Sequence, residues 1–163
     1  MSYSHYYYIP KKFDREKFKT LSEELKTVSD ILPTVQLGAK EYMVTLGDGH
    51  GENLPIFSDD EIIFNGSTKN DGDCETFLLM ADNSEAYERK NRDGLNLVEN
   101  GLMFDCCKTG GRPYDLMVCI SLLRLKHYFP ECRIASDGDT KDWKQAKEFY
   151  KKVFKTLPPK IDD

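Results

Sequence analysis

The feature that most constrains the fold is the apolar run Leu116–Leu125. Pro113 precedes this run at a position suited to the first turn of a helix, and Pro130 follows it and would stop a helix. The run is apolar on nearly every side of a helix rather than along one stripe, and such a helix belongs inside a core. It is also far shorter than the roughly 20 residues that cross a bilayer. We therefore expect a central, largely buried helix over residues 116–129.

The rest of the chain predicts two further helices and a series of strands. A helix is expected to begin after Asp14, a good capping residue, and to continue at apolar helical spacing to Leu32. A last helix is expected to begin near Thr140 and to bury Trp143. The stretch 82–94 is polar and predicts a loop or a short surface helix. Strands are expected where β-prone or apolar runs lie between turn residues, at 3–9, 40–46, 61–64, 74–80, 102–107 and 132–135.

This order of elements favours an α+β fold. Helices lie towards the ends of the chain, and strands joined by short turns occupy its middle, which predicts a two-layer sandwich with a mostly antiparallel sheet and about three helices. The strand–helix–strand unit at 102–135 could add one parallel pair through a right-handed crossover. A chain of 163 residues without a repeat or a linker predicts one domain over 1–163, with a frayed tail at 157–163.

Charge and hydropathy limit the partners. The net charge of −5 disfavours a general nucleic-acid binder, because sequence-independent affinity for phosphates comes from clustered Lys and Arg. No apolar run predicts a membrane span, and the N-terminus lacks the pattern of a signal peptide. A protein partner or a second copy of the chain remains open.

The cysteines predict a reducing, cytoplasmic compartment. Their number is odd and their spacing forms no disulfide framework. No Cys-x-x-Cys occurs, and His5, His50 and His127 lie far from any cysteine cluster in the sequence, so we expect no metal site and no cofactor. Cys106 and Cys107 are neighbours on a predicted strand and should face opposite sides of it.

The segment 107–115, CKTGGRPYD, is the strongest local candidate for function. It joins a predicted strand to the predicted central helix through a Gly-Gly turn. Free N–H groups at a helix start would suit an anion or a phosphate, with side chains supplied by five residues: Lys108, Thr109, Arg112, Tyr114 and Asp115. The segment is not a Walker loop. The structural alternative is a tight turn in which Arg112 pairs with Asp115 or another carboxylate, and ordinary turn chemistry favours it.

The segment 136–140, SDGDT, is the second candidate. It also joins a predicted strand to a helix start. If the two strands are neighbours, both turns would lie at one edge of the sheet, and Asp137 or Asp139 could act there as a base or a metal ligand beside a phosphate-bearing substrate. The alternative is that Asp139 caps a helix and that Asp137-Gly138 forms a turn.

These two segments also carry a resemblance. The sequence resembles the "KT-x-x-x-PYD … SDG … W" signature of a family of uncharacterised proteins. The matching residues are Lys108, Thr109, the run 113–115, the run 136–138 and Trp143. That family has no assigned activity. The resemblance therefore directs attention to the two turns and implies no reaction.

Two functional hypotheses follow from the sequence. The first is a non-enzymatic interaction or assembly domain, favoured because no nucleophile–base pair, metal-ligand spacing or cofactor fingerprint is evident. The second is an enzyme or binding domain for a phosphate-bearing or other anionic small molecule, with Lys108 and Arg112 as clamps and Asp137 or Asp139 as metal ligand or base. The sequence leaves open whether the protein is an enzyme.

Overall fold

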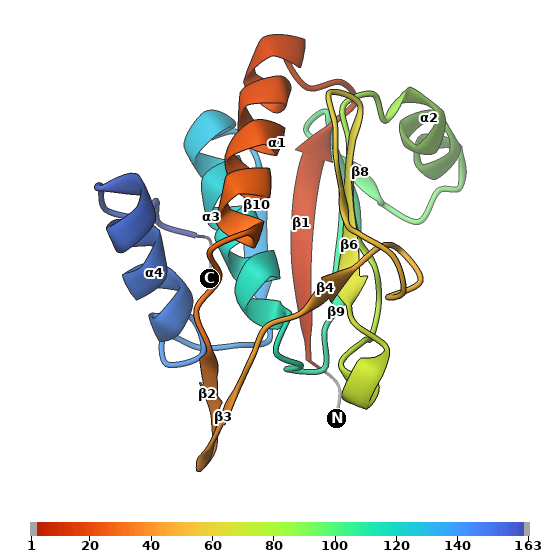
Figure 1. Cartoon of the computed structure of the whole chain (residues 1–163). Coiled ribbons are helices and arrows are strands. Elements are labelled where there is room, and N and C mark those ends of the chain that lie inside the picture. The colour runs from red at the N-terminus through yellow and green to blue at the C-terminus, as the bar shows by residue number, and fades with distance from the viewer. Residues whose placement is uncertain (1–2, 162–163) are drawn as a thin grey trace.

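Strand β1 (Ser4–Pro10) lies at the centre of the main sheet (Figure 1). In the computed structural model, which describes residues 3–161, β1 pairs with β9 (Leu102–Lys108) on one side and with β10 (Arg133–Ser136) on the other. A short strand, β8 (Val98–Glu99), extends the sheet beyond β9. All of these pairs are antiparallel.

The arrangement around β1 decides where the two candidate turns lie. Because β9 and β10 are both antiparallel to β1, they run in the same direction and end at the same edge of the sheet. The parallel pair suggested for the unit 102–135 does not form, since β1 is inserted between the two strands. The two turns therefore share an edge, separated by the start of β1.

The single sheet expected from the sequence is divided into three within residues 3–161. The second four-stranded sheet is built on β6, and the third is a two-stranded hairpin (Figure 1). The predicted strand 40–46 is split between these two sheets, because residues 40–42 pair only within the exposed hairpin. The strands are β4 (Leu46–Gly47), β5 (Ile56–Phe57), β6 (Glu61–Gly66) and β7 (Phe77–Met80) in the second sheet, and β2 (Val35–Leu37) and β3 (Lys40–Tyr42) in the hairpin.

The described residues form four α-helices where about three were expected. The additional one, α2, has no buried residue and is the short surface helix allowed for at 82–94. The Asp14 side chain caps α1 by accepting a hydrogen bond from the Lys17 N–H, but the helix ends at Ser29, before Leu32. The helices are α1 (Arg15–Ser29), α2 (Ser84–Arg92), α3 (Asp115–Tyr128) and α4 (Lys144–Phe154), and a 3-10 turn, η1, spans Lys69–Asp71.

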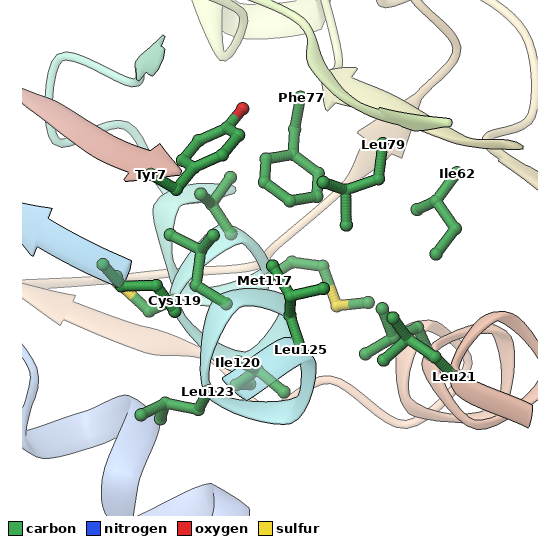
Figure 2. Close-up of a cluster of buried hydrophobic side chains, with 14 of the residues drawn as sticks. Tyr7, Leu21, Ile62, Phe77, Leu79, Met117, Cys119, Ile120, Leu123 and Leu125 are labelled. Atoms are coloured by element: carbon green, nitrogen blue, oxygen red, sulfur yellow. The ribbon is translucent and has the colours of Figure 1, made fainter. Parts of the chain in front are cut away.

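Helix α3 is the centre of the core, as the sequence predicts. Every residue from Leu116 to Leu125 is buried. Viewed along its axis, α3 is surrounded by side chains of several elements, including Tyr7 of β1, Phe77 of β7 and Leu21 of α1 (Figure 2). Burying each leucine-sized side chain contributes about 1.5–3 kcal/mol, so this helix anchors the fold. No helix in the described residues is long and apolar enough to cross a membrane.

Candidate functional site

The turn between β9 and α3 is held against the first residues of β1. The Thr109 and Gly110 N–H groups both donate to the Tyr3 carbonyl, each at 3.1 Å. Gly110 and Gly111 have φ values of 62° and 70°, a left-handed conformation that glycine adopts without steric cost. The chain therefore reverses tightly and delivers Asp115 as the first residue of α3.

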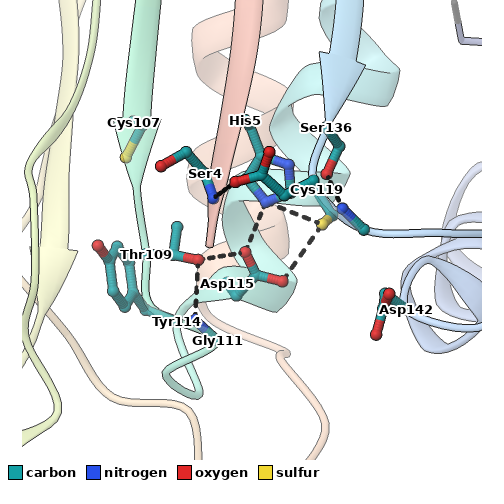
Figure 3. Close-up of polar contacts among 12 residues, drawn as sticks. Ser4, His5, Cys107, Thr109, Gly111, Tyr114, Asp115, Cys119, Ser136 and Asp142 are labelled. Carbon is teal, nitrogen blue, oxygen red and sulfur yellow. Dashed lines mark hydrogen bonds and ion pairs between the residues drawn. The ribbon is translucent and has the colours of Figure 1, made fainter. Parts of the chain in front are cut away.

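Four side chains meet where this turn, β1 and α3 come together, and we call them the Asp115 cluster: His5, Thr109, Asp115 and Cys119 (Figure 3). Asp115 Oδ1 accepts a hydrogen bond from Thr109 Oγ1 at 2.6 Å and lies 2.6 Å from His5 Nε2. Cys119 follows one helical turn later. Its Sγ lies 3.5 Å from Asp115 Oδ2 and 3.7 Å from His5 Nε2.

The Asp115 cluster is buried, yet its surroundings are incompletely hydrogen-bonded. His5, Thr109 and Cys119 are at most 1% exposed, and the Asp115 side chain is 15% exposed. His5 Nδ1, Tyr3 Oη and Trp143 Nε1 are buried without a hydrogen-bond partner in the described part of the chain. The Tyr3 and Trp143 rings meet the His5 ring edge to face, at centroid distances of 5.4 and 5.3 Å. Unpaired buried polar atoms of this kind are uncommon in folded proteins and call for an explanation.

The environment of Cys119 does not favour a nucleophilic thiolate. Burial, followed by the charge of Asp115 and a hydrogen bond to it, raises the pKa of Cys119 well above its ordinary value. A reactive cysteine needs the opposite, a lowered pKa. A Cys–His–Asp arrangement is present in space, but the geometry does not support covalent catalysis by this thiol.

A pocket of about 410 Å³ borders the cluster. Its walls are the Gly110–Pro113 turn, strand β2 and the segment around Lys141 and Asp142, and both Asp115 and Cys119 line it. This volume falls in the range of sites that hold small molecules, roughly 300–1,000 Å³. The cluster therefore lies in the wall of a cavity large enough for a ligand.

Arg112 is the predicted residue that lies best for ligand contact. It lines the pocket beside Asp115 and also a second pocket on the other side of the turn, towards Tyr42 and Lys69. Its side chain is exposed and makes no ion pair within residues 3–161. The expected pairing with Asp115 does not form, because that carboxylate faces His5 and Thr109.

The backbone cradle expected for an anion is not available. The Thr109 and Gly110 N–H groups are bonded to Tyr3, the Gly111 N–H donates to Thr109 Oγ1, and the Arg112 N–H donates to the Thr109 carbonyl. The N–H groups at the start of this turn are thus used within the protein. Recognition of an anion here depends on side chains.

Lys108 and Tyr114 were predicted to contact a ligand, but neither lines the pocket beside Asp115. The Lys108 backbone N–H donates to Glu75 Oε2 at 2.7 Å, and this residue is not part of the pocket beside Asp115. Tyr114 is 1% exposed, and its hydroxyl donates to the Glu75 carbonyl at 2.6 Å. Tyr114 therefore joins the turn to the segment before β7 and contributes to structure.

The turn after β10 uses its carboxylates internally. Asp137 Oδ2 accepts from the Ser4 N–H at 2.9 Å, and Asp137 Oδ1 accepts from the Tyr6 hydroxyl at 3.1 Å. Asp139 Oδ1 accepts from the Lys141 N–H at 2.8 Å and so caps a turn that precedes α4, which is why α4 begins at Lys144 rather than near Thr140. Neither carboxylate lines the pocket beside Asp115. The two turns share an edge, but Asp137 and Asp139 do not join Arg112 in one cluster.

Gly138 in this second turn leaves room for the Tyr3 side chain, which contacts His5 of the Asp115 cluster. A Cβ atom at this position would lie 2.1 Å from Tyr3 Oη and 3.0 Å from the Asp142 Cβ. Only glycine lets the Tyr3 ring lie against the turn and, through its edge contact, against His5. The glycine of the SDG segment is thus a positioning residue for the buried cluster.

Sequence reasoning missed His5 and Cys119. The two lie far apart in the chain, and the expectation that the histidines are remote from the cysteines is wrong in space for His5. One signal was present: Asp115 and Cys119 are four residues apart and share one face of a helix. The position of His5 opposite them depends on the insertion of β1 between β9 and β10, which no local pattern shows.

A second buried polar group lies further along α3, and we call it the Arg124 cluster: Glu24, Arg124, Tyr128, Tyr150 and Phe154. Arg124 Nε and Nη2 donate to the two Glu24 carboxylate oxygens at 2.6 and 3.1 Å, and Nη1 donates to the Tyr150 hydroxyl at 3.0 Å. The guanidinium also lies over the Phe154 ring at 4.0 Å. Burial alone would lower the pKa of Arg124, but the hydrogen bonds to Glu24 and Tyr150 outweigh it and raise that pKa.

Comparison with known proteins gives no match: no family model, no curated protein and no solved structure matches this chain. The resemblance of the two turns to an uncharacterised family therefore stays a prediction.

Proposed function

We propose that this protein binds a small molecule bearing an anionic group in the pocket beside the Asp115 cluster. The observation that carries the proposal is the position of that cluster. It is buried, it leaves polar atoms unpaired, and two of its members line a cavity of about 410 Å³. Unsatisfied buried polar groups destabilise a fold, and a functional role is one reason for a protein to retain them.

Two basic side chains that line the pocket support the anionic character of the ligand. Arg112 and Lys141 line it and have no ion pair within residues 3–161. A guanidinium presents several N–H donors in a planar fork that matches a carboxylate or a phosphate. The acidic side chains of Asp115 and Asp142 also line this pocket, so the ligand would place its anion at Arg112 and an uncharged or cationic part beside the two carboxylates.

A thermal-shift screen against nucleotides, sugar phosphates and small carboxylates tests the proposal. A ligand present at 100 times its Kd should stabilise the protein by about 2.7 kcal/mol. Arg112→Ala should abolish the shift, whereas Lys108→Ala, a neighbouring cation outside this pocket, should keep it. Equal shifts in the parent and in Arg112→Ala, or no shift with any anionic compound, would count against the site.

The hairpin β2–β3 favours a second candidate, an interaction or assembly domain. It projects from the body of the protein (Figure 1) and, with the residue after it, exposes Leu37, Tyr42 and Met43, the last at 79%. Apolar side chains gathered on a projecting element suit a protein partner or a second copy of the chain. Sedimentation at increasing protein concentration tests this candidate. Self-association that Met43→Lys removes would support it, and a concentration-independent monomer would reject self-association.

A further inference from the structure

We propose that His5, Asp115 and Cys119 bind one divalent transition-metal ion of the zinc type in the wall of the pocket. Each residue offers one donor atom, and the three atoms lie within 4.8 Å of one another. Metal binding can be measured without any organic ligand, so this inference stands or fails separately from the proposed anion site.

The donor types select the class of ion. An imidazole nitrogen, a thiolate sulfur and a carboxylate oxygen are the ligands of zinc sites, whereas Mg²⁺ and Ca²⁺ take oxygen ligands. The charges also balance. One carboxylate and one thiolate neutralise a divalent cation, and a neutral imidazole adds no charge, so the loaded site is neutral as a whole. Neutrality matters because His5 and Cys119 are buried, where an uncompensated charge is costly.

The three donor atoms lie close enough for one ion, provided that the Asp115 carboxylate adjusts its position. Bonds of about 2.0–2.3 Å in a tetrahedral arrangement place neighbouring donor atoms about 3.3–3.6 Å apart. Cys119 Sγ lies 3.7 Å from His5 Nε2, which is close to this range. It lies 3.5 Å from Asp115 Oδ2, whereas the Asp115 oxygen beside His5 is Oδ1, so the carboxylate has to turn until one oxygen faces both partners. His5 Nε2 and Asp115 Oδ1 are 2.6 Å apart, the separation of a hydrogen bond, and must open by about 0.7 Å when the ion takes the place of the shared proton. In the loaded site the neutral His5 ring would carry its proton on Nδ1.

The elements that carry the three ligands are well packed. Asp115 and Cys119 are one turn apart on the most buried helix, and His5 lies on the central strand of the main sheet. Thr109 holds Asp115 Oδ1 and is itself held by the Gly111 N–H at 3.3 Å. A hydrogen bond that orients a ligating carboxylate in this way is a regular part of metal sites.

The fourth position would open to the pocket. Asp115 and Cys119 line the cavity, while the Tyr3 and Trp143 rings pack against His5. Three protein ligands with an open fourth position are typical of catalytic zinc sites, and structural sites are closed by four protein ligands. A water or a donor atom of a bound small molecule would therefore complete the coordination, and Cys119 would bind as the thiolate with its proton released to solvent.

The test uses the full chain, stripped with a chelator and titrated with Co²⁺. We expect one Co²⁺ per chain with a sulfur-to-cobalt charge-transfer band in the near ultraviolet, which added Zn²⁺ abolishes by displacement. Cys119→Ser and Asp115→Asn should each weaken binding at least about 100-fold. Thr109→Val should weaken it about 10-fold, as expected for a group that orients a ligand.

Two control variants separate this site from adventitious binding. Cys106→Ser removes the exposed cysteine and His50→Gln removes a histidine elsewhere, and both should leave the band and the affinity unchanged. Circular dichroism checks that each variant is folded, and Asp115→Asn provides the result if Cys119→Ser does not fold. A folded parent protein without a thiolate band, or a band that Cys106→Ser removes, would overturn the proposal.

Discussion

Helix α3 carries two buried polar clusters, and they differ in how completely they are hydrogen-bonded. In the Arg124 cluster every guanidinium nitrogen has an acceptor, and Tyr128 also donates to Glu24. In the Asp115 cluster His5 Nδ1 has no partner in the described residues, and neither do the neighbouring polar atoms of Tyr3 and Trp143. One cluster is closed by its own members. The other leaves polar atoms unpaired and borders a pocket.

This difference distinguishes a structural network from a candidate site. A fully paired buried charge fixes how three helices pack, since Glu24 is on α1, Arg124 on α3 and Tyr150 on α4. An incompletely paired cluster gives the fold less stability for the same burial of polar groups. The Asp115 cluster therefore differs from a closed structural network, and the pocket that Asp115 and Cys119 line places it beside a space that a ligand can occupy.

The largest expected effect on the free energy of unfolding comes from a substitution in the Arg124 cluster. Arg124→Met removes the guanidinium, so the partly buried Glu24 carboxylate keeps only the Tyr128 hydroxyl as a donor and the Tyr150 hydroxyl loses its donor. We expect a loss of about 3 kcal/mol in the free energy of unfolding, measured by urea denaturation. Lys19→Met, at an exposed position of α1 outside the cluster, provides a comparison for the loss of one positive charge. A loss below about 1 kcal/mol for Arg124→Met would show that the cluster does not hold the helices together.

A smaller effect on the free energy of unfolding is expected from a substitution in the Asp115 cluster. Cys119→Ala removes a buried sulfur atom, and without added metal we expect a loss of about 1 kcal/mol, the cost of losing one methylene-sized group from a core. The same variant should lose any stabilisation that Zn²⁺ gives to the parent protein. Parallel urea denaturation with and without Zn²⁺ measures both quantities. A loss as large as that of Arg124→Met would mean that the two clusters serve the same structural role.

A substitution of Asp105 on β9 tests how a largely buried carboxylate outside both clusters affects stability. Burial raises the pKa of Asp105 above its ordinary value. The folded state then holds this proton more tightly than the unfolded chain, so the stability is greatest below the unfolded pKa and falls as the pH rises through the raised folded pKa. Asp105→Asn should remove this fall and raise the Tm at pH 7. An unchanged pH profile from pH 4 to 7 would contradict the expectation.

The smallest effect is expected from the exposed thiol. Cys106 is exposed, whereas Cys107, Cys119 and Cys132 are buried, and burial raises the pKa of Cys132 to about 12. Brief treatment of the native protein with iodoacetamide should modify Cys106 ahead of these three and leave the Tm unchanged. Mass spectrometry of the digested protein identifies the modified residues. Early modification of Cys119 would mean that the wall of the pocket opens readily.

The sequence predicted the centre of the fold better than the site. The apolar run in α3 and the cap at Asp14 are local patterns, and both elements form where expected. The β9–α3 turn was predicted as a place of interest, but the pairing of Arg112 with Asp115 or another carboxylate, given as the structural alternative, does not form within residues 3–161, and Asp115 faces His5 instead. The approach of His5 and the pairing of Arg124 with Glu24 each depend on contacts between residues at least 100 positions apart. No spacing in the chain encodes such contacts.

One nuclear magnetic resonance measurement compares both clusters directly. Amide ¹H–¹⁵N spectra of the full chain are recorded while Zn²⁺ is added to one equivalent. We expect shift changes at residues 3–6, 109–119 and 138–143, and unchanged peaks at Glu24, Arg124 and Tyr150. Unchanged peaks around Asp115, or changes centred on Cys106 or His50 instead, would contradict the proposed metal site.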